Sequence, residues 1–369
     1  MIPYDRLVAA IETVLVEAGA SPEVAAILAR NHAGCERDGA LSHGVFRVSQ
    51  HVDTLRTGYL DGTAEPRVET VTQSYIRVDA AGGIAQLALE RARPAALSAA
   101  RQQGVAVVAI RDSHHHSALW PDLEPFAEAG YVAITMVTGG APTVSPAGAR
   151  EAVLSTNPFA FAIPVEGAPP LIADFATSSM SYGDLTLAAQ AGRSVPPGTG
   201  VDAAGCETTD PRAILDGGAL LPFGGHKGAT LSIMVELLAS ALTGGDFTVE
   251  AQREKPAGAH STRTGQFLLI IDPDRGLSRR DAGAGAGAAG GAGPADDAGA
   301  GAGGAGSADG AGAGGLGGFA ARAAQLVEVL RNAGLDRLPA DHRYRVRRQA
   351  ESSGIPITPA IQNLLDAAG

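Results

Sequence analysis

Residues 104–137 decide the fold: GVAVVAIRDSHHHSALWPDLEPFAEAGYVAITMV. Two short β-branched runs, 105–110 and 131–137, lie on either side of a segment that contains three histidines. β-Branched residues favour strands, and glycine and proline punctuate them. Similar runs occur elsewhere, as SYIRV (74–78), FAFAI (159–163), LIADF (171–175) and FLLII (267–271). Because helical patterns alternate with these runs, we expect an α/β protein with α+β character. The pattern leaves open whether the sheet is parallel or antiparallel.

Helical periodicity marks both ends of the chain. Apolar residues at helical spacing predict a first helix over 4–18, and Ser21-Pro22 reads as the N-cap and first turn of a second helix. Another helix, 319–334, ends at a glycine, and the basic segment RYRVRR follows it. The clearest helix ends at Gly244-Gly245, and one apolar stripe marks it: Leu231, Met234, Val235, Leu238 and Leu242.

Residues 281–317 are almost wholly glycine and alanine with scattered aspartates. Such a composition buries too little apolar surface to offset its ordering entropy, so we expect a flexible surface insert. GAGAAG at 285–290 matches the glycine pattern of a dinucleotide fingerprint, but no strand precedes it. We therefore reject that motif.

The overall composition excludes several classes of protein. The chain has 369 residues and a net charge of −11 without a long basic run, which argues against nucleic-acid binding. Its two cysteines, Cys35 and Cys206, suit a reducing cytoplasm and have no metal-ligand spacing. The N-terminus does not resemble a signal peptide, and no apolar run approaches the roughly 20 residues that cross a bilayer.

The first candidate site is RDGALSHGVFR, where Ser42, His43 and Arg47 follow the second helix. Histidine exchanges a proton near neutral pH, and arginine binds carboxylates in a bidentate manner. The alternative is that Ser42 is a capping serine and His43 a structural turn histidine.

The second candidate is His114-His115-His116 at the end of a strand. Neighbours in extended chain point to opposite faces, so we favour a catalytic or packing role over a metal site.

Two further candidate segments could bind the phosphate or ribose of a nucleotide, or another anion. Thr156 and Asn157 lie beside one apolar run, and Asp174, Thr177 and Ser178 lie beside the next, with Asp184 in a following helix. Hydroxyls and backbone amides there could bind phosphate or ribose, although ordinary helix capping is as plausible. Lys227 lies in the glycine-rich turn LLPFGGHKG at a helix N-terminus, which suits an anion. A Walker motif is absent.

Taken together, these motifs resemble the type 2 malate and L-lactate dehydrogenases. SHGVFR, SHHHSA, STNP, DFATS, TTDP, LLPFGGHKG, LPADHRYRVRR and SGIP occur in the family's order, outside the Gly/Ala insert. The resemblance implies a non-Rossmann NAD(P)-binding fold with a largely antiparallel cofactor-domain sheet. It divides the chain into a helical substrate and dimerisation domain (1–118 plus 319–369) and an NAD(P)H-binding domain (119–280).

HHHSALWPDLEPFAEAG and SYGD are similar to the family's cyclic-imine reductases. That similarity implies a homodimer, with its site near the subunit interface, that uses NADPH, or alternatively NADH. Hydride transfer to C=N would convert piperideine-2-carboxylate or pyrroline-2-carboxylate to L-pipecolate or L-proline.

The resemblance also implies roles for single residues, with no metal ligand among them. His43 and His115 would be acid/base groups, and Arg47, with Ser42, would bind the substrate carboxylate. Thr156 and Asp184 would face the substrate, and Asp184 would favour a cationic imine over a ketone. The cofactor would contact Asp174, Phe175, Ala176, Thr177, Ser178, Gly225, His226 and Lys227.

Two departures and three alternatives stand beside this interpretation. Many relatives have Asn-Ser where this chain has Gly139-Gly140, and Ala340-Asp341 replaces Gly-Glu or Gly-Asp. A 2-hydroxy acid dehydrogenase acting on a ketone is the main rival. A histidine-rich metal hydrolase and a non-catalytic cofactor-binding relative are the others.

Overall fold

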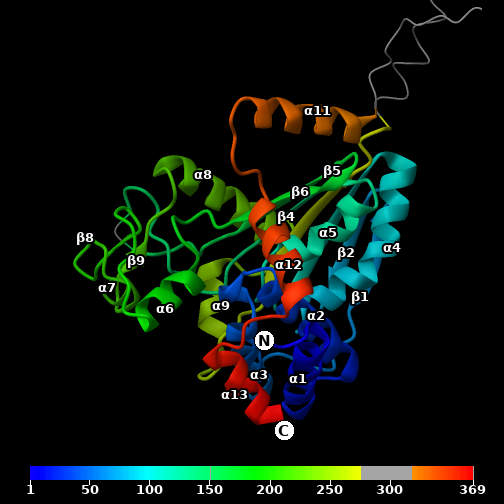
Figure 1. The fold of residues 1–369 in the computed structure, drawn as a ribbon. Helices are drawn as coiled ribbons and strands as arrows, with labels where there is room; N and C mark the ends of the chain where they lie inside the picture. The colour runs from blue at the N-terminus through cyan, green and yellow to red at the C-terminus, as the bar shows by residue number, and fades with distance from the viewer. Residues whose placement is uncertain (150, 276–317, 369) are drawn as a thin grey trace, which may run out of the picture.

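The computed structural model describes residues 1–149, 151–275 and 318–368. Its centre is a seven-stranded sheet of order β1-β2-β3-β10-β4-β5-β6 (Figure 1). Only the β2–β3 pair is parallel among these neighbours, so the sheet is largely antiparallel, as expected. The strands are β1 (Arg67–Thr72), β2 (Tyr75–Asp79), β3 (Val105–Ser113), β4 (Val132–Val137), β5 (Phe159–Val165), β6 (Ala168–Phe175) and β10 (Thr264–Ile271).

All six apolar runs singled out in the sequence form strands of this sheet. The last of them, β10, lies in the middle, and its Leu268 and Ile270 are fully buried. The sequence patterns did not reveal β1, because every one of its six residues is exposed and no apolar alternation marks it. The strands come from both sides of the expected boundary at residue 118, and the division into two domains stays a prediction.

Helices at the two ends of the chain pack into one helical layer at the bottom of Figure 1. Leu7, Ile11 and Ile361 share its core, and Ile2 forms a β-bridge with Ile355. Ser21 caps the second helix as predicted, because its Oγ accepts from Val24 N at 3.3 Å. The helices of this layer are α1 (Tyr4–Glu17), α2 (Pro22–Arg37), α3 (Val48–Arg56) and α13 (Pro359–Ala368).

Two helices flank the sheet, and a short one lies farther along the chain. α4 (Ala85–Gln103) packs on β3, and α5 (Trp120–Glu128) packs on β5 and β6. α9 (Thr248–Glu254) precedes the central strand β10. Together α4 and α5 cover the apolar face of the sheet that carries Ile110, and Phe126 of α5 packs into the same core.

The long helix is present but irregular. α8 (His226–Val235) continues into the π-helical segment Glu236–Ala241, and Gly244 adopts a positive φ of 77° beyond it. The predicted stripe is only partly a core face, because Val235 is buried and Leu242 is 45% exposed. A π-turn rotates the residues that follow it around the axis, which displaces the stripe from the sheet.

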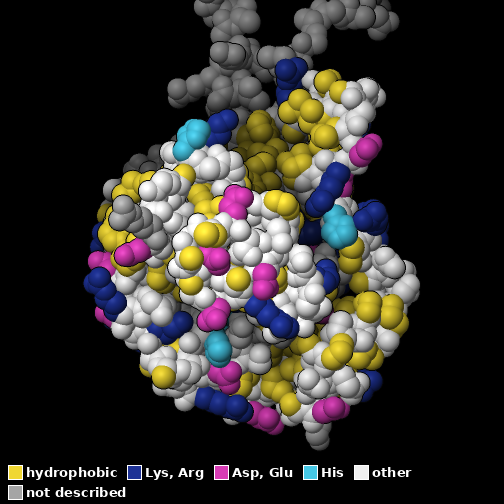
Figure 2. All heavy atoms as spheres, turned by 90° about the vertical axis from the view of Figure 1, so that its left-hand side faces the viewer, with side chains coloured by type: hydrophobic (Ala, Val, Ile, Leu, Met, Phe, Trp, Pro, Cys, Tyr) yellow, Lys and Arg dark blue, Asp and Glu magenta, His cyan; other side chains and the backbone are white. Residues whose placement is uncertain are grey.

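A smaller unit projects from the sheet on the left of Figure 1. It contains α6 (Tyr182–Gln190), α7 (Pro211–Leu215) and a three-stranded sheet of order β8-β7-β9 (Glu207–Thr208, Gly200–Val201, Ala219–Leu220). Leu185, Ile214 and Leu220 form its own core. Acidic and basic side chains are interspersed on this face, without a patch of one sign (Figure 2).

The C-terminal part returns to the sheet. α11 (Phe319–Asn332) crosses the top of Figure 1 beside β5, and none of its residues is buried. α12 (Asp341–Ser353) runs back toward α2. The Gly/Ala insert predicted at 281–317 lies outside the described residues.

Candidate active site

Two adjoining cavities lie between the helical layer, the sheet and α6. The smaller, about 280 Å³, is called the reaction pocket here, and its lining includes His43, Arg47, His115, Thr156 and Thr262. The larger, about 1250 Å³, is called the long groove, and its lining includes Ser42, Asp174, Ser178, Asp184 and Arg343. His43, Ser117, Thr156 and Pro158 line both cavities. Segments far apart in the sequence therefore meet in one continuous site.

Arg47 is a half-buried cation that forms no ion pair with a carboxylate of the described residues. It ends the short helix Val45–Arg47, and its Nε donates to Ser42 O at 2.9 Å. Its Nη1 donates to Gln50 Oε1 at 2.8 Å and lies 3.0 Å from His116 Nε2. Burial lowers the pKa of Arg47 to about 10, and nearby Asp184 and Tyr182 partly offset this. Neutral acceptors thus hold the guanidinium beside a pocket that suits an anion.

Most of the histidines of this region are kept neutral. Burial, reinforced by Arg47, lowers the pKa of His43 to about 3 and that of His116 well below 6.5. Burial also lowers the pKa of His32 and of His114 to about 4. We call these the buried histidine cluster: His32, His43, His51, His114 and His116. His43 Nδ1 lies 3.0 Å from Ser42 Oγ, so it is placed for hydrogen bonding rather than for holding a charge.

His115 differs from this cluster because it has a carboxylate partner. Its Nε2 lies 2.8 Å from Asp122 Oδ2, and both side chains are buried. Gln266 Nε2 donates to the same oxygen at 2.8 Å. Asp122 therefore fixes the ring and its tautomer while His115 lines the reaction pocket. The sequence patterns did not single out Asp122, although it is an acidic residue in the first turn of the helix that follows the histidines.

Asp184 lies at the N-terminus of α6, close to Arg47. Ser181 Oγ caps the helix by accepting from Asp184 N at 3.0 Å and donates to Asp184 Oδ2 at 2.7 Å. Gly183 makes the close approach possible, because a Cβ there would lie 2.9 Å from Ser42 Cβ and 3.0 Å from Arg47 Nη2. Helix capping, the alternative to a ligand-binding role, does occur here through Ser181 and Asp184. The Asp184 carboxylate nevertheless also lines the long groove.

Hydrogen bonds from Asn157 and Glu236 support the loop that follows β4 and contains Gly139. Asn157, fully buried with a φ of 36°, accepts from Gly139 N at 3.1 Å through its Oδ1. Its Nδ2 donates to Glu236 Oε1 at 2.9 Å, and Thr248 N donates to Glu236 Oε2 at 3.1 Å. The π-helical segment that carries Glu236 thus supports the Gly139-Gly140 wall of the reaction pocket. Thr156, next in sequence to Asn157, lines both cavities.

The predicted cofactor segment at the end of β6 lines the long groove only in part. Asp174, Phe175, Ala176 and Ser178 line it, whereas Thr177 is buried and donates to Thr156 O at 3.0 Å. Asp174 Oδ2 accepts from Leu119 N at 2.8 Å and Trp120 N at 3.0 Å, so this carboxylate caps α5. Burial nevertheless raises the pKa of Asp174.

The second predicted cofactor segment lies near the first but outside both cavity linings. Gly225, His226 and Lys227 are exposed at the start of α8. Phe223, just before them, lines the groove, and its ring centroid is 6.0 Å from that of Phe175. The two segments are also joined by Phe223 N, which donates to Thr177 O at 3.1 Å.

The far end of the long groove is basic. Arg337, His342 and Arg343 line it, and the Arg343 guanidinium stacks over Trp120 at 5.1 Å. Arg347 anchors this part of α12, because its guanidinium donates to both oxygens of Asp38 and of Glu124. Cations and aromatic rings on one wall fit the phosphates and base of a dinucleotide.

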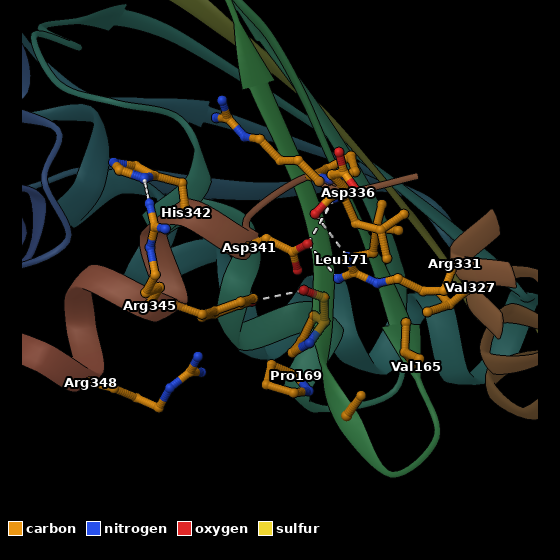
Figure 3. Close-up of a pocket in the computed structure, with 16 residues that line it drawn as sticks. Val165, Pro169, Leu171, Val327, Arg331, Asp336, Asp341, His342, Arg345 and Arg348 are labelled. Carbon is orange, nitrogen blue, oxygen red and sulfur yellow. Dashed lines mark hydrogen bonds and ion pairs between the residues drawn. The ribbon is translucent and has the colours of Figure 1, made fainter. Parts of the chain in front are cut away.

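Another hollow, about 510 Å³, lies between α11, the β5–β6 hairpin and α12 (Figure 3). Arg331 pairs with Asp341 across it, and Arg345 Nη2 donates to His342 Nδ1 at 2.9 Å. It shares Arg337 and His342 with the long groove, but no predicted site residue lines it.

Two further findings concern the described residues. Within them, no group of three or more His, Cys, Asp or Glu side chains is arranged to hold a metal ion. No helix there is long and apolar enough to span a membrane.

The site combines an arginine held by neutral acceptors, a histidine bonded to a buried carboxylate and an adjoining groove with basic residues, beside a sheet that is not of the Rossmann type. These features suit a dehydrogenase. Residues 2–289 match the family model described as malate/L-lactate dehydrogenase. The chain belongs to this family. It is an oxidoreductase that acts on a small molecule, and the family implies a nicotinamide cofactor.

Relatives cover the whole chain. It is 44% identical to a Delta(1)-pyrroline-2-carboxylate/Delta(1)-piperideine-2-carboxylate reductase of Pseudomonas syringae pv. tomato, over 100% of this chain and 96% of the relative. It is 44% identical to a reductase of the same name from Pseudomonas putida, over 100% of this chain and 97% of the relative. The crystal structure of delta1-piperideine-2-carboxylate reductase from P. syringae superposes with a TM-score of 0.86 at 43% identity, covering 100% of this chain and 99% of that one.

Proposed function

We propose that the protein is an NADPH-dependent reductase of cyclic 2-imino carboxylates, converting piperideine-2-carboxylate or pyrroline-2-carboxylate to L-pipecolate or L-proline. The observation that carries the proposal is that Arg47 lines the reaction pocket while Asp184, near enough to raise the pKa of Arg47, lines the adjoining long groove. The substrate has an anionic carboxylate and, when protonated, a cationic C=N group. Arg47 is placed to bind the carboxylate, and Asp184 is placed to stabilise the cationic C=N group.

The cofactor, when bound, supplies the hydride. The long groove would hold it, with its nicotinamide end toward the residues that both cavities share, near His43 and Thr156. Asp174, Phe175, Ala176 and Ser178 would form one wall, and Thr177 would position that wall. Arg337 and Arg343 would bind phosphate groups, including the 2′-phosphate that distinguishes NADPH from NADH. Gly225, His226 and Lys227 would extend this surface at the start of α8.

We assign the transferable proton to His115. Asp122 holds its Nε2 side, which leaves Nδ1 for the bound imine nitrogen. His43 is buried and beside Arg47, which disfavours a protonated ring, so it would orient the ligand with Ser42 as a neutral hydrogen-bonding pair. A bound carboxylate would offset the charge of Arg47 and ease protonation of His43. Comparison of His43→Gln with His115→Gln tests the assignment: only the second should remove a limb of the pH–rate profile.

Asp184 provides the preference for imine over ketone. Its charge favours a cationic C=N–H group and offers nothing to a neutral C=O. Asp184→Ala should therefore reduce kcat/KM for the cyclic imine more than that for a keto acid. Equal losses for the two substrates would show that Asp184 acts only through its contact with Ser181, the cap of α6.

The rival function is a 2-hydroxy acid dehydrogenase, since Arg47 and His115 would also suit a 2-oxo acid. Steady-state oxidation of NADPH and NADH with both cyclic imines, pyruvate and oxaloacetate separates the two. We expect the imines to exceed the keto acids in kcat/KM and NADPH to exceed NADH. The reverse substrate order would establish the dehydrogenase.

We further propose a homodimer with the site near its interface. α11 exposes Leu326 at 58% and Val329 at 62%, and α8 exposes Ile233 at 50%. Exposed apolar helix faces of this kind suit a second copy of the chain. Leu326→Glu should produce monomers in light-scattering measurements, whereas Arg322→Glu on the same helix should leave the dimer intact.

A further inference from the structure

Gly140 and Thr262 occupy complementary positions in the wall of the reaction pocket. A Cβ atom at Gly140 would lie 2.2 Å from Thr262 Oγ1, so this hydroxyl fills the space that a side chain at 140 would need. A hydroxyl also fills the side-chain space of the preceding residue, because a Cβ at Gly139 would lie 1.9 Å from Ser155 Oγ. The two glycines therefore do not leave an empty wall; hydroxyl groups from other segments replace their side chains.

The Thr262 hydroxyl has no hydrogen-bond partner in the part of the chain that the structure describes. The residue is only 4% exposed, and the hydroxyl is buried. The preceding residue differs in this respect, because Ser261 Oγ lies 2.8 Å from His114 Nδ1. A buried hydroxyl without a partner costs stability, and such groups are retained where a ligand completes them.

We propose that Thr262 is a ligand-binding residue of the reaction pocket. Its Oγ–H donates to a carbonyl-type oxygen of the molecule bound beside Arg47 and His115, which line the same pocket. Two such oxygens can enter there, one in the substrate carboxylate and one in the nicotinamide carboxamide, and the chemistry of recognition is the same. This inference rests on the proposed function and adds a specificity-determining residue to it.

Thr262→Val tests the proposal, because valine keeps the shape and removes the hydroxyl. Two titrations are made: NADPH, followed by its fluorescence and by quenching of Trp120 in the long groove, and pyrrole-2-carboxylate, a planar analogue that is not reduced, followed by calorimetry. One of the two Kd values should rise about three- to tenfold, as expected for one lost hydrogen bond. Which one rises identifies the oxygen. Neither titration needs turnover, so a failure of the proposed reaction would leave this result readable.

Thr243→Val is the matched control. Thr243 is also 4% exposed, but its Oγ1 donates to Ala239 O at 2.7 Å, inside the protein. We expect Thr243→Val to lower Tm and to leave both Kd values unchanged. Thr262→Val should keep or raise the Tm of the unliganded protein, because it removes an unpartnered polar group.

A side-chain exchange between the two positions provides a second test. The ligand in this test is the one whose Kd rises in Thr262→Val. Gly140→Ser should weaken its binding because the new Cβ meets the Thr262 hydroxyl, and Thr262→Ala should weaken its binding by removing the donor. The double variant Gly140→Ser/Thr262→Ala relieves the contact and returns a hydroxyl to the same space, so it should bind more tightly than either single variant. Unchanged Kd values in Thr262→Val, together with a Tm loss like that of Thr243→Val, would overturn the proposal.

Discussion

Replacing Asp122 by asparagine should impair proton transfer while leaving the fold intact. The carboxylate accepts from His115 Nε2 and Gln266 Nε2, both at 2.8 Å, on one oxygen. In Asp122→Asn the amide oxygen can serve only as a neutral acceptor, and the amide nitrogen can force the other tautomer of His115. Positioned acid/base groups contribute about 10²- to 10⁴-fold, so we expect kcat to fall by at least about 100-fold.

The assay is kcat and kcat/KM for a cyclic imine from pH 5 to 10, with Tm and NADPH affinity measured alongside. The limb of the profile assigned to His115 should move or disappear, while the Kd for NADPH stays within about threefold. Glu124→Gln is the matched control, because Glu124 lies on the same helix and pairs with Arg347 at 2.9 Å. It should affect stability and leave the profile unchanged. A kcat for Asp122→Asn within about threefold of wild type, with the same profile, would refute the role of the pair.

Three further predictions follow from the geometry of the site. Arg47→Met should raise KM for the imine by about 10- to 100-fold, the value of a charge-assisted contact, whereas Arg91→Met, which breaks a surface pair, should not; equal effects would remove Arg47 from carboxylate binding. Gly183→Ala should weaken binding of the carboxylate because its Cβ meets Ser42 and Arg47, while Gly34→Ala, with nothing within 4 Å, should be neutral. The pKa values of the buried histidine cluster are lowered, so its rings are neutral in the fold and take up protons on unfolding below pH 6.5. The free energy of unfolding, measured by denaturant titration, should keep the whole contribution of these histidines above about pH 6.5. It should fall by up to about 1.4 kcal/mol per pH unit per histidine toward pH 4, and a free energy that does not change over this pH range would contradict the assigned burial.

The strands and end helices were predictable because their apolar periodicity is local. Ser21 and Pro22 mark a helix start whatever lies around them, and β10 is a continuous apolar run. β1 was not predictable, since its exposed residues have no pattern. The π-helical turn at Glu236 depends on buried contacts to Asn157 and Thr248 that no spacing reveals.

The candidate site was predictable at the level of segments rather than of single roles. Ser42, His43, Arg47, His115 and Thr156 do line adjoining cavities. The roles of Asp174 and Thr177 in capping and packing come from tertiary hydrogen bonds, which the motif could not show. Asp122 contacts Gln266 and Thr262 adjoins Gly140, and both of these partners are distant in sequence, so neither residue stands out as part of a motif.

The most direct test of the whole account is deuteride transfer. The protein is incubated with piperideine-2-carboxylate and NADPH deuterated at the transferable C4 position, and the product is examined by NMR and mass spectrometry. We predict L-pipecolate with one deuterium at C2, formed by wild type and strongly reduced in Arg47→Met. Absence of labelled pipecolate, with lactate or malate labelled from the corresponding keto acid instead, would contradict the account.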